Sequence, residues 1–317
     1  MKAVVVRHAG GPEVLEYTTV PTPTTKPGWS LVNIKGFGIN HSEIFTRRGD
    51  SPSVKFPRIL GIECVGEIEK TTDPGRLPVG QHVISIMGEM GRAFDGSYAE
   101  KVLLPNNQIY PVTTQLSWAQ LATMSETYFT AFGSMLNLHL TPHDRVLVRA
   151  ATSGVGVAFA KLVHAAYPAL HLVGSTRNLK KAPRLLQVGY SDVIEDQAGH
   201  LQTDDHYDKC LELVGPKTIK DTFAHMQSGG IVCLTGLLGD QWTIPHFDPI
   251  EDLPTNSYLT SFNSATVNEF KINQMIKFIE QYHVNLKPAR IFKLNEIQKA
   301  HEYLESNHSF GKVIVLE

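Results

Sequence analysis

The stretch that decides the fold runs Arg145-Val146-Leu147-Val148-Arg149-Ala150-Ala151-Thr152-Ser153-Gly154-Val155-Gly156. Its first half is typical of a strand, and it leads directly into a helix of small and apolar residues that continues to Ala166. Small residues in such a turn let the backbone approach a pyrophosphate, whose charge the helix N-terminus stabilises through free N–H groups and its dipole. We therefore predict a dinucleotide site at Ser153, Gly154, Val155 and Gly156.

As a glycine fingerprint this turn is imperfect. Ala151 and Ser153 stand where the first two glycines are usual, and only Gly156 keeps the third. The strand before it, the helix after it and a second strand about 20 residues further on favour the dinucleotide interpretation. The alternative is a glycine-rich strand-to-helix turn without a ligand.

The end of the second strand indicates which nicotinamide cofactor is bound. Enzymes that use NAD usually place a carboxylate there, which accepts hydrogen bonds from the ribose hydroxyls. This chain has Ser175, Thr176 and Arg177 instead, followed closely by Lys180 and Lys181. An arginine fork and hydroxyl groups suit the 2′-phosphate of NADP, so we predict NADPH as the cofactor. In the alternative interpretation these cations only solvate the start of a helix.

Outward from this stretch the sequence predicts an α/β protein with two domains. The first hundred or so residues are β-rich, with short apolar runs between glycine and proline turns at 3–6, 30–34, 63–68, 82–87 and 98–104. From about Ser117, a plausible helix N-cap, strands at 145–150, 170–175, 192–194, 209–214 and 230–235 alternate with helices, which indicates a parallel sheet. The tail predicts a helix with Phe270, Met275, Ile276 and Ile279 on one face, a second helix around Ile297 to Leu304, and a last strand at 312–316.

Composition excludes several classes of partner. A formal net charge of −2 provides no basic face for nucleic acid or for anionic lipid, and no stretch approaches the length of a membrane span. The N-terminal apolar run is too short for a signal peptide. Three widely spaced cysteines argue against a disulfide framework and fit a reducing cytoplasm, and Cys233 is expected to be a buried, inert thiol. A small molecule is the expected partner.

The order of several motifs resembles that of the medium-chain dehydrogenase/reductase superfamily, in its zinc-free quinone-oxidoreductase and enoyl-reductase-like branch. The motifs are Gly38-Ile39-Asn40-His41-Ser42-Glu43, Phe56-Pro57-Arg58-Ile59-Leu60-Gly61-Ile62-Glu63, Val79-Gly80-Gln81-His82-Val83, Asp95-Gly96-Ser97-Tyr98-Ala99-Glu100 and Gly311-Lys312-Val313. The resemblance implies a GroES-like β-barrel catalytic domain (residues 1–116 plus 263–317) with an inserted Rossmann domain, a doubly wound parallel sheet (residues 117–262). It also implies a homodimer.

The resemblance also bears on zinc. The positions that hold a catalytic ion in zinc-dependent relatives correspond here to Asn40, Ile62 and, in a looser match, Glu126. An amide and an aliphatic side chain cannot make such a site, which needs three protein ligands, and the lobe for a structural zinc is missing as well. We expect the His41 side chain to be hydrogen-bonded within the protein or exposed to water, rather than to replace a missing zinc ligand. We therefore expect no metal.

By resemblance, further residues surround the cofactor and the acceptor. Asn40 is expected to lie beside the nicotinamide and to donate an N–H to the cofactor or to the substrate oxygen. The remaining assignments are Thr130 at the nicotinamide ribose, Phe262 and Asn263 near the nicotinamide amide, Thr235-Gly236-Leu237 in the cofactor groove, and Lys312 as a cofactor neighbour.

A dedicated proton donor is not evident. Several enoyl reductases of this branch use a tyrosine shortly after the asparagine element, whereas this chain has Phe45-Thr46-Arg47-Arg48-Gly49. Water is the default donor, and Tyr128 is a candidate that could equally be a packing aromatic. Glu63 is expected in a structural salt bridge or hydrogen bond. Arg47 and Arg48 are expected in a solvated turn, with the rim of the entrance as the alternative.

The predicted activity is hydride transfer from NADPH to a quinone or an α,β-unsaturated carbonyl, because such acceptors spread negative charge without a Lewis acid. Two alternatives remain. One is a non-catalytic NADPH-binding redox sensor or scaffold, which the missing tyrosine would suit. The other is a zinc alcohol dehydrogenase.

Overall fold

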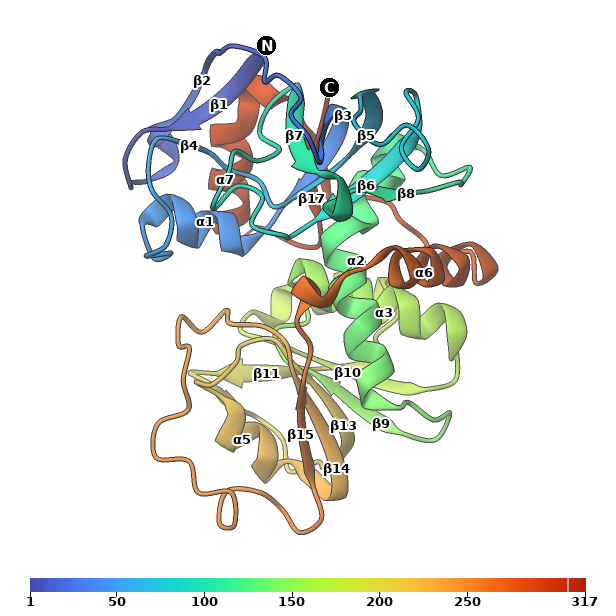
Figure 1. Ribbon diagram of the computed structural model, residues 1–317. Coiled ribbons are helices and arrows are strands. Elements are labelled where there is room, and N and C mark those ends of the chain that lie inside the picture. The colour runs from blue at the N-terminus through green and yellow to red at the C-terminus, as the bar shows by residue number, and fades with distance from the viewer. Residues whose placement is uncertain (307) are drawn as a thin grey trace. The chain divides into compact units, whose positions relative to one another are not determined.

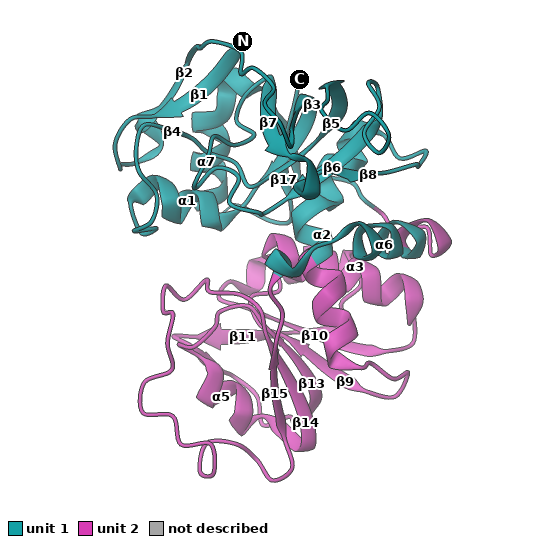
Figure 2. Cartoon of the chain, viewed as in Figure 1, with its two compact units in different colours: residues 1–129, 264–278, 286–317 teal, residues 130–263, 279–285 magenta. Residues whose placement is uncertain are grey.

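The computed structural model describes residues 1–306 and 308–317. Its contacts divide the chain into two compact units (Figure 2). Unit 1 comprises Met1–Phe129, Ser264–Phe278 and Leu286–Glu317, and unit 2 comprises Thr130–Asn263 and Ile279–Asn285. The sequence predicted domain boundaries at 116/117 and 262/263. They stay a prediction about which residues form the catalytic domain and which form the nucleotide-binding domain.

Unit 1 is built on two sheets. A small sheet has the order β2-β1-β4, and a larger one has the order β16-β17-β3-β5-β6-β8, with β7 also paired to β3. The strands are β1 (Lys2–Val6), β2 (Leu15–Thr19), β3 (Trp29–Ile39), β4 (Arg58–Ile59), β5 (Glu63–Lys70), β6 (His82–Ile86), β7 (Lys101–Pro105), β8 (Tyr110–Pro111), β16 (Arg290–Phe292) and β17 (Val313–Leu316). β17 pairs antiparallel with β3, so the chain's last strand joins its first long one.

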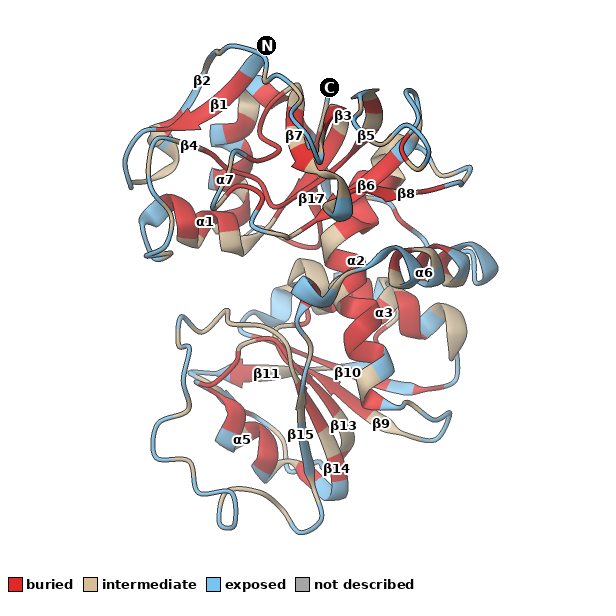
Figure 3. Cartoon of the chain, in the orientation of Figure 1, coloured by how far each residue is buried: buried red, intermediate tan, exposed pale blue. Residues whose placement is uncertain are grey.

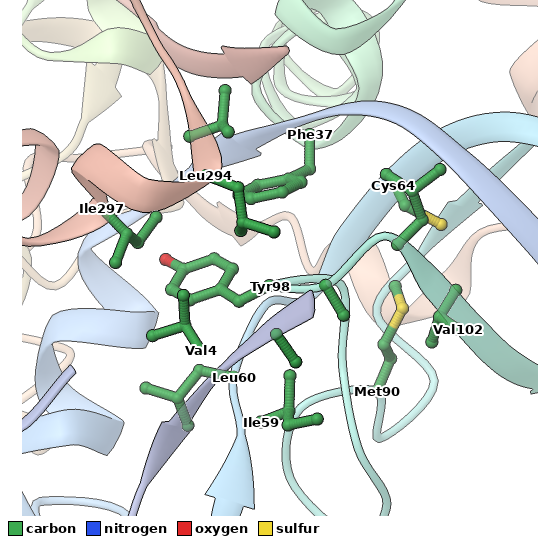
Figure 4. Packing of buried hydrophobic residues seen from close by; sticks show 14 of the residues in the cluster. Val4, Phe37, Ile59, Leu60, Cys64, Met90, Tyr98, Val102, Leu294 and Ile297 are labelled. Carbon is green, nitrogen blue, oxygen red and sulfur yellow. The ribbon is translucent and has the colours of Figure 1, made fainter. Parts of the chain in front are cut away.

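Two helices, α1 (His41–Arg48) and α7 (Ile297–Glu305), bury apolar side chains such as Ile44 and Ile297 in this unit. The unit also has the short turns η1 (Pro12–Val14), η2 (Asn106–Gln108), η4 (Ser264–Thr266) and η5 (Leu294–Glu296), of which η5 leads directly into α7 and buries Leu294. In Figure 4 the ring of Tyr98 lies among Val4, Phe37 and Leu294. Its ring stacks on Phe37 at a centroid distance of 5.0 Å. Burial of such side chains is the main favourable term for this unit.

The segment that includes Arg47 differs from the prediction. It forms α1, part of which is buried (Figure 3), rather than a solvated turn. Arg47 is only 1% exposed. Its guanidinium donates to the Gly10 carbonyl at 3.1 Å and to His301 Nδ1 at 3.0 Å, and it pairs with Glu305. Because Nδ1 accepts from Arg47, the His301 ring is protonated at Nε2, which donates to the Tyr98 hydroxyl at 2.9 Å. Arg48 is exposed and also pairs with Glu305.

Unit 2 contains one sheet with the order β12-β11-β10-β9-β13-β14-β15. Its strands, side by side in Figure 1, are β9 (Arg145–Val148), β10 (His171–Thr176), β11 (Asp192–Gln197), β12 (His200–Leu201), β13 (Tyr207–Glu212), β14 (Met226–Leu234) and β15 (Tyr258–Ser261). All neighbouring pairs are parallel except β11 with β12. The order reverses between β9 and β13, so the predicted doubly wound parallel sheet is confirmed.

The helices of unit 2 are α3 (Gly154–Ala166), α4 (Ala182–Gln187), α5 (Ile219–Ala224) and the short turn η3 (Leu179–Lys181). α3 buries a run of seven residues, from Gly156 to Ala160 with Leu162 and Val163, because its small and apolar side chains can pack closely. A core cluster that includes Leu147, Val173 and Phe223 fills the unit.

Two helices contribute residues to both units, α2 (Trp118–Leu138) and α6 (Glu269–Gln281). The predicted N-cap at Ser117 is confirmed: its hydroxyl accepts from Gln120 N at 3.4 Å, and its own N–H donates to the Gln120 side chain at 2.9 Å. For α6, Met275, Ile276 and Ile279 are buried as expected. The placement of Phe270 on the same face was wrong, because Phe270 is 76% exposed and Ile272 is buried instead.

Other expectations from the sequence were largely confirmed. The predicted strand at 98–104 begins later, at Lys101, because Tyr98 leaves the ladder to fill the core. Cys233 is buried, as predicted, and all three cysteines are free thiols. Across residues 1–306 and 308–317, no helix combines the length and the apolar character that crossing a membrane requires.

A buried ion network lies at the carboxyl end of the unit 2 sheet. Arg149, which follows β9, is fully buried and contacts Asp196 at 2.6 Å and Asp221 at 2.7 Å. Its Nε lies 3.9 Å from the Glu212 carboxylate. Glu212 in turn accepts hydrogen bonds from Val214 N and Gly215 N. The network therefore joins the ends of β9, β11 and β13, next to the predicted dinucleotide turn.

Replacing Arg149 by Met should lower the free energy of unfolding by about 3–5 kcal/mol, because it leaves buried carboxylates without their counter-ion. Urea denaturation followed by circular dichroism measures the change. Arg145, on the same strand, is the matched control: its pair with Asp205 is exposed on both sides, so Arg145→Met should cost less than about 1 kcal/mol. Equal losses for the two variants would contradict this view of the network.

Candidate functional site

In unit 2 the turn between β9 and α3 has the geometry of a helix N-terminal anion site. Ser153 caps α3, and its hydroxyl accepts from Gly156 N at 3.1 Å. Ala150 has a φ of 57°, which turns the chain sharply after the strand. Ser153, Gly154 and Val155 are partly exposed, so the first N–H groups of α3 are accessible to a ligand.

Close backbone packing explains two glycines around this turn. A Cβ on Gly156 would lie 2.7 Å from the Ala151 carbonyl oxygen, which is closer than real side chains come. On Gly174 it would lie 2.8 Å from the Ala151 Cβ. Ala151 N also donates to the Ser175 carbonyl at 3.0 Å, which ties the turn to the end of β10. Gly156 therefore serves the close helix–strand packing expected of the third fingerprint glycine.

The end of β10 carries hydroxyl groups and cations. Ser175 is fully buried, and in the part of the chain that the structure describes its Oγ has no hydrogen bond partner. Thr176 Oγ1 accepts from Asn178 N at 3.2 Å, and Arg177 is exposed. Burial lowers the pKa of Lys181, and the positive charges of Arg184 and Arg177 lower it further. The positive charges of Arg177 and Arg184 thus act on the Lys181 ammonium.

Four more predicted residues gather at the ends of β14 and β15. Thr235 Oγ1 lies 2.9 Å from Ser134 Oγ, which donates to the Thr130 carbonyl at 2.8 Å. A Cβ on Gly236 would lie 2.2 Å from the Leu213 carbonyl oxygen, so only glycine fits there. Phe262 packs on Gly133, where a Cβ would meet its ring at 1.9 Å. Asn263 is the next residue after Phe262 in the chain.

In unit 1, Asn40 lies at the junction of β3 and α1. Its backbone N donates to Glu43 Oε2 at 3.0 Å, which with the Asn40 side chain completes a capping box for α1. Its Nδ2 donates to Glu63 Oε1 at 2.8 Å and to Glu43 Oε1 at 3.3 Å. Its Oδ1 accepts from Lys312 Nζ at 2.7 Å and from Thr127 Oγ1 at 3.5 Å.

Glu63 and Lys312 form the ion pair behind Asn40, with Nζ 2.6 Å from Oε1. Glu63 is fully buried and Lys312 is 5% exposed. Burial alone would raise the pKa of Glu63, but the Lys312 charge and hydrogen bonds from Lys312, Ser125 and Glu126 N outweigh it, so that the pKa is lowered. Glu63 therefore stays ionised and has the structural salt bridge predicted for it.

Gly38 makes room for this pair. A Cβ there would lie 2.1 Å from Lys312 Cε and 2.4 Å from Glu63 Oε1. Gly38 faces Ile314 in the β3–β17 ladder, so the Lys312 side chain passes directly over the backbone of β3. The Gly-x-Asn spacing of the motif is thus explained by the ion pair.

The first half of α2 completes the cluster. Ser125 Oγ and Glu126 N both donate to Glu63 Oε2. Glu126 itself accepts from Ser264 Oγ at 2.8 Å. Tyr128 is 2% exposed, and burial raises its pKa, which keeps the phenol protonated.

The residues at the positions of the zinc ligands do not fit a zinc ion. Asn40 is an amide whose oxygen faces an ammonium, and Ile62 is a buried aliphatic side chain without a lone pair. Glu126 supplies one carboxylate, fewer than the three protein ligands that a catalytic site needs. Within residues 1–306 and 308–317, no group of three or more His, Cys, Asp and Glu side chains is arranged to hold a metal.

The predicted site residues thus fall into two groups. Asn40, Tyr128 and Lys312 belong to unit 1, and the others belong to unit 2. Lys312 contacts Asn40 and Glu63 directly, which the sequence analysis did not foresee. Glu43 was also missed as a partner of Asn40, although the Asn-x-x-Glu spacing of a capping box was a usable signal.

Glu43 makes stability depend on pH. Burial and the negative charge of Glu63 raise its pKa from 4.5 to about 7, although Lys312 counteracts part of the shift. Between these two values the folded protein holds a proton that the unfolded chain has released. Stability should therefore fall by up to about 3 kcal/mol as pH rises through that window.

Denaturation measured from about pH 5 to about pH 8 tests this prediction. Glu43→Gln should flatten the decline, whereas Glu302→Gln, at an exposed position of α7, should preserve it. The same slope in the Glu43 variant as in the wild type would show that Glu43 does not titrate in this range.

Two family models match the chain. The alcohol dehydrogenase GroES-like domain covers residues 26–114, which confirms the predicted GroES-like part of unit 1. The zinc-binding dehydrogenase model covers residues 188–315.

Individual relatives agree with this assignment. The putative quinone oxidoreductase YhfP of Bacillus subtilis is 30% identical over 232 residues, which span 70% of this chain and 69% of the relative. The quinone oxidoreductase of Rattus norvegicus is 26% identical over 338 residues, with 100% and 98% covered. Among solved structures, the yhdH oxidoreductase from Salmonella enterica in complex with NADP has a TM-score of 0.86 at 19% identity, with 100% of both chains covered. The chain belongs to the medium-chain dehydrogenase/reductase superfamily of oxidoreductases, in its quinone-oxidoreductase-like branch.

Proposed function

We propose that the protein is an NADPH-dependent reductase that reduces a quinone or an α,β-unsaturated carbonyl without a metal ion. The observation that carries the proposal is the strand–turn–helix site of unit 2. There the partly exposed, Ser153-capped start of α3 follows a turn whose Ala151 N–H bonds the Ser175 carbonyl, at the strand end that carries Thr176 and Arg177. Unit 1 is proposed as the catalytic part and unit 2 as the nucleotide-binding part.

The residues of unit 2 fit NADPH. Ser153, Gly154, Val155 and Gly156 would hold the pyrophosphate at the start of α3. The 2′-phosphate would be bound by Ser175, Thr176 and Arg177, where no carboxylate stands at the end of β10 to repel it. The Salmonella enterica relative, which was solved with NADP, supports this choice of cofactor.

The remaining residues of unit 2 would contact the nicotinamide end. We assign Thr130 to the ribose, Thr235 and Gly236 to the groove, and Phe262 and Asn263 to the carboxamide. Bound NADPH supplies a hydride. The protein orients the acceptor, excludes water and stabilises the negative charge that develops on the acceptor oxygen.

In unit 1, Asn40 is the proposed donor to that oxygen. Tyr128, whose buried phenol stays protonated, belongs to the same unit, and water remains the proposed source of the one proton that the acceptor needs after it has taken up the hydride. An acceptor that spreads its charge by conjugation suits such a site, because an amide donor is weaker than a Lewis acid. Neither the Asn40 amide nor the aliphatic Ile62 side chain suits a zinc ion, and this supports a reaction without zinc.

Three further predictions concern the binding partner, the location in the cell and the oligomeric state. The expected partner is a small molecule, and neither nucleic acid nor a membrane is proposed. A cytoplasmic location agrees with three free, buried cysteines. A homodimer is proposed through β15, an edge strand of the unit 2 sheet whose Tyr258 and Leu259 side chains are 62% and 38% exposed.

Activity is tested by following NADPH oxidation by the purified protein across a panel of quinones and enones. We expect turnover with at least one class, no turnover with simple ketones or alcohols, and no loss of rate after treatment with a chelator. Elemental analysis of the same sample should find less than stoichiometric zinc.

Two outcomes would contradict the proposal. Tight NADPH binding without turnover on any acceptor would favour the non-catalytic sensor or scaffold. Stoichiometric zinc, with activity that disappears on its removal, would favour a zinc alcohol dehydrogenase.

The choice of cofactor rests on Arg177. Arg177→Ala should raise the Kd for NADPH roughly 10- to 100-fold, because it removes a charge-assisted hydrogen bond worth about 1.5–3 kcal/mol. The Kd for NADH, which lacks the 2′-phosphate, should change little. Fluorescence titration with both nucleotides measures the two constants.

Arg145→Ala removes an exposed cation from the same unit and is the control for general electrostatic effects. It should leave both constants unchanged. If Arg177→Ala weakened NADH as much as NADPH, Arg177 would not select the 2′-phosphate.

A further inference from the structure

The charges around Asn40 are shielded from any ligand. Glu43, Glu63 and Lys312 are 1%, 0% and 5% exposed, and Thr127 is 3% exposed. Asn40 is partly exposed. Lys312 and Glu63 therefore do not contact a reacting molecule themselves, and Asn40 is a partly exposed side chain that both of them bond.

The same neighbours determine the orientation of the Asn40 amide. Oxygen and nitrogen of an amide are nearly equal in size, so packing alone does not distinguish the two orientations. Here Lys312 can only donate, and an ionised Glu63 can only accept. Oδ1 must therefore face Lys312 Nζ at 2.7 Å, and Nδ2 must face Glu63 Oε1 at 2.8 Å.

We propose that Lys312 and Glu63 are positioning residues that fix the Asn40 amide with one N–H held by Glu63 and the other available to an acceptor oxygen. The second N–H has only the longer contact of 3.3 Å to Glu43 Oε1, and it can be redirected at small cost. This inference rests on the proposed function, and it gives Lys312 a different role from the cofactor neighbour that the family resemblance implied.

The ammonium also strengthens the donor. Hydrogen bonds in a chain polarise one another, so an amide whose oxygen accepts from a cation has a more positive N–H. The chain runs from Lys312 Nζ through Asn40 Oδ1 and Nδ2 to the acceptor. Because Glu63 balances the charge of Lys312, the pair can be kept buried while this polarisation acts.

A charge-neutral double variant, Lys312→Met with Glu63→Gln, tests the proposal. Lys312→Met alone leaves a buried carboxylate without its counter-ion and is expected to destabilise the fold, so the double variant carries the test. We expect kcat with the best quinone or enone to fall on the order of 10- to 100-fold. The acceptor KM and the Kd for NADPH should change less than about 3-fold.

The matched control is Lys35→Met with Glu67→Gln. Lys35 on β3 and Glu67 on β5 form another lysine–glutamate pair of unit 1 with an N–O distance of 3.3 Å, but their side chains are 31% and 34% exposed. This variant should keep the wild-type kcat. Equal losses in both double variants would overturn the positioning role.

Asn40→Ala, introduced into the wild type and into the neutral double variant, tests whether the pair acts through Asn40. If it does, Asn40→Ala lowers kcat strongly in the wild type and has little further effect in the double variant. Independent, additive losses would show that Lys312 and Glu63 act elsewhere.

A readout that needs no turnover separates this inference from the proposed function. With nitrogen-15 in the asparagine side chains, the Asn40 Nδ2 signal is identified by its loss in Asn40→Asp. In the wild type we expect the Nδ2 proton held by Glu63 to exchange slowly and the other Nδ2 proton to exchange faster. In the neutral double variant we expect faster exchange of the proton that is slow in the wild type. Unchanged exchange would overturn the inference even if the enzyme is active, whereas absent turnover with the expected exchange would overturn only the proposed function.

Discussion

Unit 1 depends on keeping one ammonium and two carboxylates out of water where β3, β5 and β17 meet. Lys312 and Glu63 lie 2.6 Å apart at 5% and 0% exposure, so neither can lose its partner without a large cost. Several local features follow from this pair. Gly38 lacks a side chain because the pair occupies that space, α2 directs Ser125 and a backbone N–H at Glu63, and Asn40 covers the charges. The second carboxylate, Glu43, caps α1 and shares the same Asn40 amide.

Unit 2 handles a buried charge in a related way. Arg149 follows β9, is fully buried, and links the ends of three parallel strands through carboxylates. The turn that we propose for the dinucleotide begins at the next residue, Ala150, so the network lies directly beside that turn. In both units, buried ions thus lie next to a residue or turn proposed for the site, namely Asn40 in unit 1 and the turn after β9 in unit 2. Preorganisation of this kind is what a reaction that relies on electrostatic stabilisation requires.

The sequence predicted local features well and distant contacts poorly. The β9–α3 turn and the N-cap at Ser117 follow from a few adjacent residues, and the structure has both. Arg47 was misjudged because arginine is rarely buried, and its partner His301 lies 254 positions away. The contact of Lys312 with Asn40 spans 272 positions, so no spacing rule could reveal it. Phe270 was misplaced because the apolar positions of α6 include Ile272, which fits the buried face better.

The central claim is that a hydride passes from NADPH to a conjugated acceptor in a site organised without a metal. The most direct measurement uses NADPH with deuterium at both hydrogen positions of the nicotinamide C4 and an enone as acceptor, in chelator-treated protein. The account predicts that mass spectrometry finds deuterium on the β-carbon of the saturated product, because that carbon receives the hydride. Product without deuterium, or product formed only after zinc is added back, would contradict it.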